Sequence, residues 1–230
     1  MIVDRINAYL SANEKSVNEV VLENVGRMAS KTFSRQMMEE RAPDPAPTLR
    51  LSAAGHCGRQ LAYKLHGVAE NGKKIDARAK MVFWMGDLIE YTILSLAKLA
   101  GVSVFATDSD QIVLWSQING VQVIGHPDGI LLYEGEGYIV EVKSMASYAF
   151  ERFERGEIER SYLVQVNSYL QALSLKKAIF VALNKDSGVM GERVIHYDVS
   201  LWSEAEDRLK RVAASTPGTL PDREFAPNEK

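Results

Sequence analysis

The stretch Gly125-His-Pro-Asp-Gly-Ile-Leu-Leu-Tyr-Glu-Gly-Glu-Gly-Tyr-Ile-Val-Glu-Val-Lys143 contains two apolar segments separated by a glycine-rich turn. We expect the segments 129–133 and 138–144 to be strands, because both are apolar and rich in β-branched or aromatic residues. The Glu-Gly-Glu-Gly sequence at 134–137 is typical of a turn. The stretch therefore predicts a β-hairpin, around which the rest of the fold is built.

Three charged side chains would meet at this hairpin. Strand periodicity puts Glu141 and Lys143 on one face and turns Val142 into the core, and the hairpin brings Asp128 beside them. Two carboxylates about 4 Å apart repel each other by roughly 4 kcal/mol at an effective dielectric near 20, and a bound Mg²⁺ or Mn²⁺ would reverse this penalty. Alternatively, Asp128 is a turn residue and Lys143 an ordinary ion-pair partner of Glu141.

A polar pair follows on the next predicted helix. The apolar positions of Ser161–Leu175 have helical spacing, and Gln165 and Tyr169 are four residues apart, so they share a face. With this order of motifs the chain resembles the PD-(D/E)XK nuclease superfamily, in particular its RecB-type and CRISPR-associated exonuclease branch. The resemblance implies an α/β fold with a restriction-endonuclease-like core, in which a central mixed β-sheet is flanked by helices.

The resemblance also points to an acidic residue upstream. Relatives carry a helical Gly followed four residues later by a His or an acid that completes the metal site, and here these positions are Gly86 and Glu90. The glycine is expected to let a neighbouring chain approach while the carboxylate reaches the metal. Asp87 is the competing candidate for the metal ligand, and a solvated helix acid is the plain alternative for Glu90.

The resemblance implies a metal-dependent DNA hydrolase. Lys143 would position the attacking water or help to deprotonate it, Gln165 would hydrogen-bond the lysine or a phosphate, and Tyr169 would contact the phosphate backbone. The expected metal ligands are Glu90, Asp128, Glu141 and the Val142 carbonyl, holding Mg²⁺ or Mn²⁺. The expected catalytic residues are Asp128, Glu141, Lys143, Gln165 and Tyr169.

The most specific function that these motifs indicate is an exonuclease that acts at DNA ends in recombination, repair or phage DNA metabolism. A structure-selective endonuclease of the same superfamily and a nuclease-like module that binds DNA or protein without cleaving are the alternatives, and a small-molecule phosphodiesterase is a third. No ATP-binding loop or helicase motif accompanies the site, so the enzyme would work alone or with a recombinase, an annealing protein or a helicase.

A single cysteine limits the cofactors. Some relatives bind an iron–sulfur cluster through several cysteines, whereas Cys57 is the only cysteine here, and four thiolates are the usual requirement. We therefore expect no iron–sulfur cluster and no intramolecular disulfide, which agrees with a reducing cytoplasm of a bacterium or a phage-infected host.

Length and composition are those of one globular enzyme. The chain has 230 residues, 46% of them hydrophobic, and no apolar run reaches the roughly 20 residues that span a bilayer. We expect an N-terminal helical arm with a proline-rich linker (1–45), a nuclease core (46–214) and an extended tail (215–230). Further expected helices are 52–66, 76–99 and 201–214, and further expected strands are 102–106, 111–115, 120–125, 178–183 and 192–198.

The net charge of −3 is unusual for a protein that binds phosphate chains. Between residues 59 and 80, however, six basic residues stand against two acidic ones. This segment is the best candidate for a DNA-tracking surface, and a solvated helix face is the alternative. The candidate DNA-binding residues are Arg59, Lys64, Lys73, Lys74, Arg78 and Lys80.

Overall fold

A computed structural model gives the structure of the protein, and it describes residues 1–13, 17–37, 47–68, 76–107 and 111–224. Seven helices are described: α1 (Ile2–Ser11), α2 (Glu19–Met37), α3 (Gly58–Leu65), α4 (Ala77–Leu99), α5 (Ser147–Glu154), α6 (Arg160–Leu173) and α7 (Val199–Ala213). The strands are β1 (Thr48–Arg50), β2 (Val104–Phe105), β3 (Leu114–Ile118), β4 (Val121–Gly125), β5 (Gly129–Tyr133), β6 (Glu136–Met145), β7 (Lys177–Asn184) and β8 (Met190–His196). A single 3-10 turn, η1, covers Leu51–Ala53.

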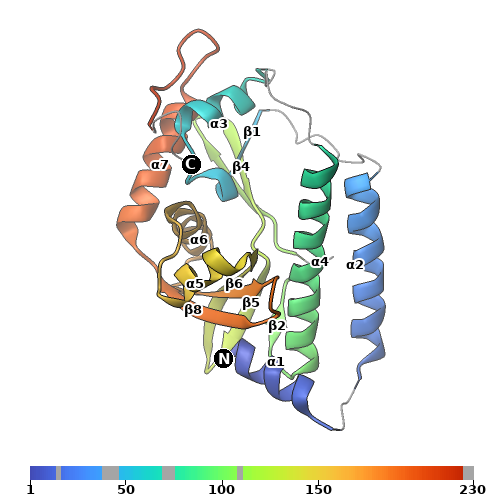
Figure 1. The fold of residues 1–230 in the computed structure, drawn as a ribbon. Coiled ribbons are helices and arrows are strands. Elements are labelled where there is room, and N and C mark those ends of the chain that lie inside the picture. Colours follow the sequence, from blue (N-terminus) through green and yellow to red (C-terminus); the bar gives the residue numbers. More distant parts are fainter. Residues whose placement is uncertain (14–16, 38–46, 69–75, 108–110, 225–230) are drawn as a thin grey trace.

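The central sheet has five strands in the order β2-β5-β6-β7-β8. Strands β6 and β7 are parallel, and the other neighbours are antiparallel. Helices lie on both sides of this sheet (Figure 1). The expected fold class, α/β with a central mixed sheet flanked by helices, is therefore confirmed.

The strands before the hairpin belong to a second sheet. Strands β3 and β4 pair with each other and with β1 in the order β1-β4-β3, so the chain changes sheets in the segment 126–128 between β4 and β5. The sequence predicted neither β1 nor this change. The parallel pairing of β1 with β4 joins residues more than 70 positions apart, such as Thr48 and Gln122, and local patterning cannot indicate such a pairing.

The predicted hairpin is confirmed, although its turn is shorter than expected. Tyr133 pairs with Glu136, which leaves Glu134 and Gly135 as a two-residue turn. Both residues have positive φ, 51° and 80°, which is the geometry of the tight turns that match the strand twist. The expected turn at 134–137 is thus wrong by two residues, and β6 begins at Glu136.

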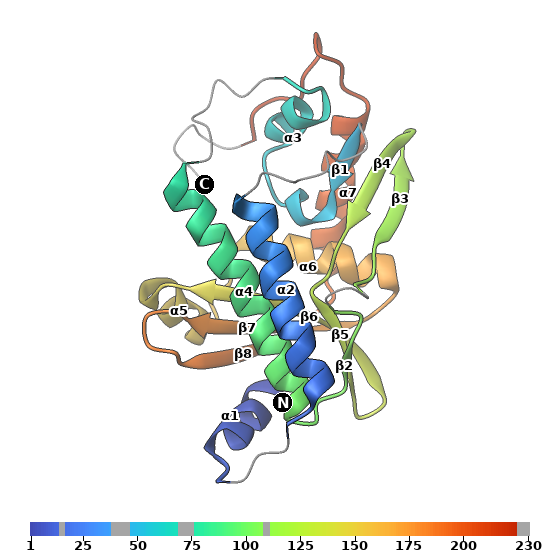
Figure 2. The ribbon, with the colours of Figure 1, turned by 90° about the vertical axis from the view of Figure 1, so that its right-hand side faces the viewer.

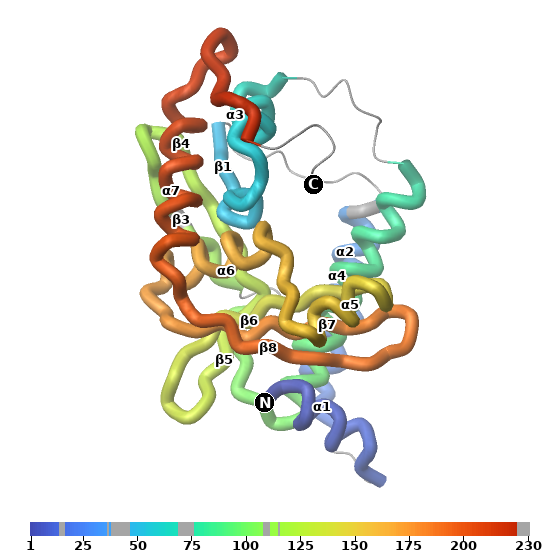
Figure 3. Tube along the Cα trace, turned by 60° about the vertical axis from the view of Figure 1, so that its left-hand side comes forward, coloured from blue at the N-terminus to red at the C-terminus, as the bar shows by residue number. Residues whose placement is uncertain are grey.

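The two faces of the central sheet pack against different helices. Val140 and Val142 of β6 join a core with α1 and α4, whereas Ile139 joins a core with α6 and α7. Figure 2 shows α4 and α2 running across one side of the molecule, and Figure 3 shows α5 and α6 beside the sheet on its other side. Glu141 and Lys143 alternate with the valines, so they belong to the face that α6 covers.

The first residues form two separate helices. Ile2 and Ile6 of α1 are fully buried in the core with α4. Helix α2 packs along α4, where Phe33 and Trp84 meet edge to face with ring centroids 5.5 Å apart. The expected proline-rich linker before residue 46 lies outside the described residues. None of the described helices combines the length and the apolarity that crossing a bilayer requires.

Helix α7 is tied to the rest of the fold by a buried arginine. Arg208, 6% exposed in its side chain, donates to the Ala54 carbonyl at 2.7 Å, to Glu204 at 2.9 Å and to Glu224 at 2.6 Å. Glu224 belongs to the expected C-terminal tail, whose described part therefore returns to the core. Glu224 also accepts a hydrogen bond from Arg211, whose side chain is 56% exposed.

Replacing Arg208 by methionine is expected to lower the free energy of unfolding by about 2–3 kcal/mol, because the Ala54 carbonyl loses a buried donor and the partly exposed Glu204 and Glu224 lose their cation. The matched change Arg211→Met removes an exposed contact to the same Glu224 and should cost no more than about 1 kcal/mol. Urea denaturation of both variants measures the difference. Equal losses would show that the burial of Arg208 does not determine its contribution.

Candidate active site

Asp128 lies where the chain passes from one sheet to the other. Its side chain is buried, and its Oδ2 accepts a hydrogen bond from the Val142 backbone N–H at 2.8 Å. The preceding residue is also fixed, because Gln111 Nε2 donates to the Pro127 carbonyl at 3.0 Å. The crossing segment thus holds the carboxylate against strand β6, as the predicted hairpin requires.

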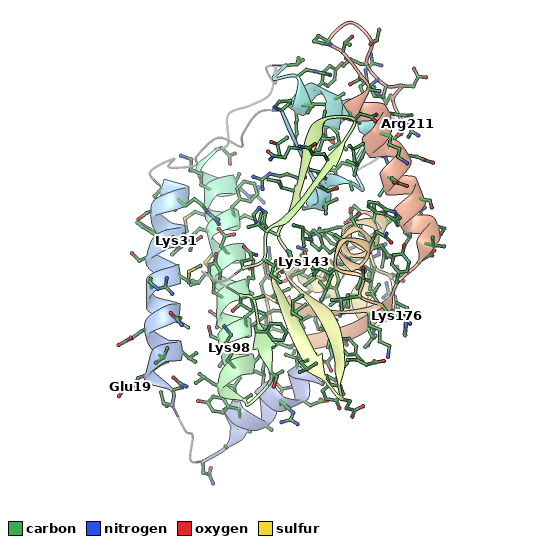
Figure 4. The ribbon with its side chains drawn as sticks, turned by 180° about the vertical axis from the view of Figure 1, so that it is seen from behind. Glu19, Lys31, Lys98, Lys143, Lys176 and Arg211 are labelled. Atoms are coloured by element: carbon green, nitrogen blue, oxygen red, sulfur yellow. The ribbon has the colours of Figure 1, made fainter. Side chains whose placement is uncertain are left out.

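Glu141 is the centre of the polar cluster. Its side chain is 0% exposed, and its Oε1 accepts hydrogen bonds from Lys143 Nζ at 2.6 Å and from Gln165 Nε2 at 2.7 Å. Its second oxygen, Oε2, is buried and has no hydrogen-bond partner among the described residues. In Figure 4, Lys143 lies near the middle of the molecule, between α4 and α6. Two donors therefore fix one carboxylate oxygen of Glu141, and none of the described residues donates to the other.

The helix α6 supplies the polar pair that the sequence predicted. Gln165 Nε2 also lies 3.4 Å from the Tyr169 hydroxyl. Tyr169 is only 1% exposed, and its ring packs against Gly125, where an added Cβ would come within 2.9 Å of the tyrosine Cε1. In this structure Tyr169 supports Gln165 from inside, so its predicted contact with a phosphate stays a prediction.

The neighbouring carboxylates act on the ionisation of Asp128. Burial raises the pKa of Asp128 well above its usual value, and the negative charges of Glu141 and Glu90 raise it further. The Lys143 ammonium and the hydrogen bond from the Val142 N–H oppose this rise without cancelling it. Burial and nearby negative charge thus disfavour the ionised form of Asp128, and a bound cation would favour it.

Lys143 is held in its charged form. Burial alone would lower the pKa of Lys143, but the negative charges of Glu141 and Asp128 outweigh burial and raise it. The ammonium therefore acts here as a hydrogen-bond donor and a positive charge. Deprotonation of water by Lys143, one of the two roles expected from the sequence, would first require the lysine to lose this proton.

The two acids of α4 occupy different surroundings. Asp87 contacts α2, where it accepts a hydrogen bond from the Thr32 hydroxyl at 2.6 Å and pairs with Arg35. Glu90 lies close enough to Asp128 to affect its pKa. The structure thus places Glu90 on the side of the cluster and Asp87 against the neighbouring helix, and metal ligation by Glu90 stays a prediction.

The expected role of Gly86 is wrong. A Cβ placed on Gly86 would meet no atom of the described residues within 4 Å, so no neighbouring chain approaches it closely.

Glycine in the interior of a helix destabilises it by about 0.5–1 kcal/mol relative to alanine. We expect Gly86→Ala to raise the free energy of unfolding by this amount, as measured by urea denaturation, and a loss of stability would reveal a contact at this position.

The cluster fits a hard divalent cation. Its candidate ligands are carboxylate and carbonyl oxygens, which Mg²⁺ and Mn²⁺ prefer, and the unpartnered Oε2 of Glu141 lacks the contact that a buried oxygen normally has. The described residues contain no group of three or more acidic, histidine or cysteine side chains assembled to hold a metal. Mg²⁺ is usually bound through one or two carboxylates together with waters and substrate phosphate, so Asp128 and Glu141 meet this requirement.

Tyr162 lies beside the cluster and is not among the site residues predicted from the sequence. Lys143 Nζ lies 5.4 Å from the centroid of its ring, a distance at which the ring attracts a cation. Tyr162 is three residues before Gln165, and Tyr169 is four residues after it, so these side chains form a stripe along α6. The spacing of the two tyrosines from Gln165 could have indicated this stripe, but the apolar residues of the same helix also have helical spacing, so the tyrosines were not distinguished from them.

The candidate DNA-binding residues fall on two helices. Arg59 and Lys64 belong to α3, and Arg78 and Lys80 belong to the first turn of α4. Both helix segments lie toward the same end of the molecule (Figures 1 and 2). The candidates Lys73 and Lys74 lie outside the described residues. A DNA-tracking role for these side chains stays a prediction.

Comparison with known proteins identifies the fold. The sequence matches no protein-family model and no curated protein. The crystal structure of LHK-Exo in complex with dAMP superposes with a TM-score of 0.52 at 16% identity, over 80% of this chain and 91% of that chain. A structure of LHK-Exo, an alkaline exonuclease from Laribacter hongkongensis, gives a TM-score of 0.47 at 14% identity, over 80% of this chain and 93% of that chain.

A third similar structure is that of SSO0001, with a TM-score of 0.49 at 15% identity, over 83% of this chain and 85% of that chain. The superposition with the dAMP complex of LHK-Exo is the one that exceeds a TM-score of 0.5 among these three. The chain therefore has an α/β fold similar to that of a known exonuclease.

Proposed function

We propose that this protein is a divalent-metal-dependent deoxyribonuclease of the PD-(D/E)XK type that acts at DNA ends. The observation that carries the proposal is the state of Glu141, whose Oε1 is fixed by Lys143 and Gln165 while its Oε2 is buried without a partner. Such an oxygen, beside a second buried carboxylate, suits a cation, and the cation and the ammonium together suit a phosphate. A purely structural ion pair would leave this buried oxygen without a partner.

The fold comparison supports an exonuclease. The similar structure with the highest of the three TM-scores is described as LHK-Exo in complex with dAMP, so a nucleotide is a ligand of that protein. We propose DNA as the substrate of this chain and DNA ends as its point of attack. A recombinase, an annealing protein or a helicase is the kind of partner that would supply such ends, in the cytoplasm of a bacterium or of a phage-infected cell.

Mg²⁺ or Mn²⁺ would be held by Asp128, Glu141 and the Val142 carbonyl, with Glu90 as a further ligand. When bound, such an ion lowers the pKa of a water and neutralises charge on the scissile phosphate. No iron–sulfur cluster belongs to this proposal.

The side chains around Glu141 have distinct roles. Lys143 keeps its proton and donates hydrogen bonds, so it positions the attacking water and stabilises negative charge that develops on the phosphate oxygens. Gln165 donates to the same Glu141 oxygen at 2.7 Å and keeps the carboxylate from rotating. Tyr169 supports the glutamine from the core, so both α6 residues act as positioning residues.

The experiment that tests this proposal compares linear DNA, labelled at either end, with closed circular DNA in Mg²⁺, in Mn²⁺ and in EDTA. We expect metal-dependent degradation of the linear DNA while the circle stays intact, and the order in which label is released gives the polarity. Nicking of the circle would replace the exonuclease by an endonuclease. DNA binding without cleavage in either metal would indicate a nuclease-like binding module.

A further inference from the structure

A pocket opens directly beyond the candidate active site. It has a volume of about 190 Å³ and lies between the end of strand β6, helix α5 and the start of α6. The residues of its lining that matter here are Met145, Ala149, Arg152, Phe153, Ile158 and Tyr162. Of these residues only Tyr162 also contacts the cluster around Glu141, so the pocket adjoins the cluster and has its own lining.

The pocket and the catalytic cluster share one wall. Tyr162 lines the pocket, and its ring lies 5.4 Å from Lys143 Nζ. Along β6, Met145 follows Lys143 by two residues, so the two side chains share a face and are separated by about 7 Å of strand. This separation is comparable to that between the phosphate and the base within one nucleotide.

The lining of the pocket suits a nucleobase. Tyr162, Ile158 and Ala149 provide aromatic and apolar surface, and charged groups stand at the rim, where Arg152 pairs with Glu157 at 2.9 Å. A flat ring can pack against the apolar wall while its edge meets the polar rim. A phosphate would meet the carboxylates Glu157 and Glu159 there, so the anionic part of a substrate belongs at Lys143 instead.

The walls of the pocket are held in place. The first turn of α5 is anchored by Ser147, whose backbone N–H and hydroxyl both donate to Asp186 at 2.8 Å. Phe153 is 1% exposed and packs against Phe180 with ring centroids 6.0 Å apart. The cavity therefore exists before any ligand arrives, which reduces the entropy lost on binding.

We propose that this pocket takes the base of the nucleotide next to the scissile phosphate, while the phosphate lies at Lys143 and Glu141. The inference rests on the proposed function and specifies its substrate. A base must unstack from its neighbours to enter such a pocket, and the free energy of unstacking is smallest in single strands and at frayed ends. The substrate class is thus an unpaired terminal nucleotide, in agreement with attack at DNA ends.

The test measures binding and does not require cleavage. The probes are thymidine 3′,5′-bisphosphate and the same bisphosphate lacking the base, titrated into the full-length protein with Mn²⁺ by calorimetry. Stacking of one base contributes enough affinity to make the complete nucleotide bind about tenfold or more tightly than the base-free probe. Since both probes carry phosphate on both sides of the sugar, the comparison is independent of cleavage polarity.

A pair of phenylalanine substitutions on α5, one inside the lining and one outside it, tests whether the pocket binds the base. Ala149→Phe adds a ring to the lining and should bring the affinity for the nucleotide down to that for the base-free probe. Glu151→Phe places the same ring elsewhere on α5, outside the lining, and should leave the tenfold difference intact. Equal binding of the two probes to the unaltered protein would overturn the inference, even if Ala149→Phe fails to fold.

The outcomes also separate this inference from the proposed function. Selective nucleotide binding that Ala149→Phe removes, in a protein that cleaves no DNA, would support the base pocket and reject the nuclease. Cleavage of DNA by a protein that binds both probes equally would support the nuclease and reject the base pocket.

Discussion

Replacing Lys143 by arginine is expected to reduce the rate of DNA cleavage by about 10²- to 10³-fold without unfolding the protein. Arginine keeps the positive charge beside the buried Glu141, but its planar, wider guanidinium cannot donate from the position of Nζ, 2.6 Å from Glu141 Oε1. Removing one hydrogen-bond donor that stabilises the charge developing in the transition state typically lowers the rate by this factor. Single-turnover digestion of end-labelled DNA measures the rate.

Lys143→Met provides the complementary variant. It should abolish cleavage and also lower the free energy of unfolding, because Glu141 would be left buried without its ammonium partner. Lys185→Met, an exposed lysine beyond the end of β7, is the matched control and should change neither quantity. Full activity in Lys143→Arg would mean that charge alone is needed at this position and that the proposed positioning of water is wrong.

Asp128→Asn is expected to abolish cleavage and, in EDTA, to make the protein more stable. The asparagine Oδ1 can still accept from the Val142 N–H, which donates to Asp128 at 2.8 Å, while the repulsion with Glu141 and Glu90 disappears. Two like charges a few ångströms apart repel by roughly 1–4 kcal/mol, so at a pH above the raised pKa of Asp128 the free energy of unfolding should rise by about that amount. Urea denaturation in EDTA measures it.

The pH dependence of the same variant gives an independent check. The pKa of Asp128 is raised in the folded protein, chiefly by burial and then by Glu141, so the folded state binds a proton more tightly than the unfolded chain. The stability that this proton contributes is present below the unfolded pKa of about 3.9 and is lost as the pH rises through the raised pKa. The free energy of unfolding of Asp128→Asn should not fall in this way over the same pH range. A variant that is less stable than the parent in EDTA, at a pH above the raised pKa of Asp128, would show that the charge of Asp128 does not destabilise the metal-free folded protein.

The part of the fold that the sequence predicted is the part that local patterns encode. Alternation in 138–144 and the glycine-rich turn identified the hairpin, and helical spacing identified α6 with Gln165 and Tyr169 on one face. The positions of Asp128 and Glu141 followed from these two elements. The structure brings both carboxylates, Lys143 and Gln165 together as that reasoning requires.

The missed elements depend on contacts between distant parts of the chain. Strand β1 has only three residues, Thr48–Arg50, and exists because it pairs with β4. Helix α5 has eight residues, too few for a clear periodic pattern, and is stabilised by burial of Phe150 and Phe153. The pocket follows from α5 and from Tyr162, so it could not be foreseen before that helix was placed.

Release of label from linear DNA by the unaltered protein in Mg²⁺ or Mn²⁺, with Asp128→Asn and an EDTA sample alongside, decides whether this protein is a metal-dependent nuclease. We expect cleavage that requires the metal and is absent from the Asp128→Asn variant, which remains folded. Cleavage that persists in EDTA or in Asp128→Asn would contradict this expectation, because the phosphodiester would then be hydrolysed without the carboxylates at the crossing between the two sheets.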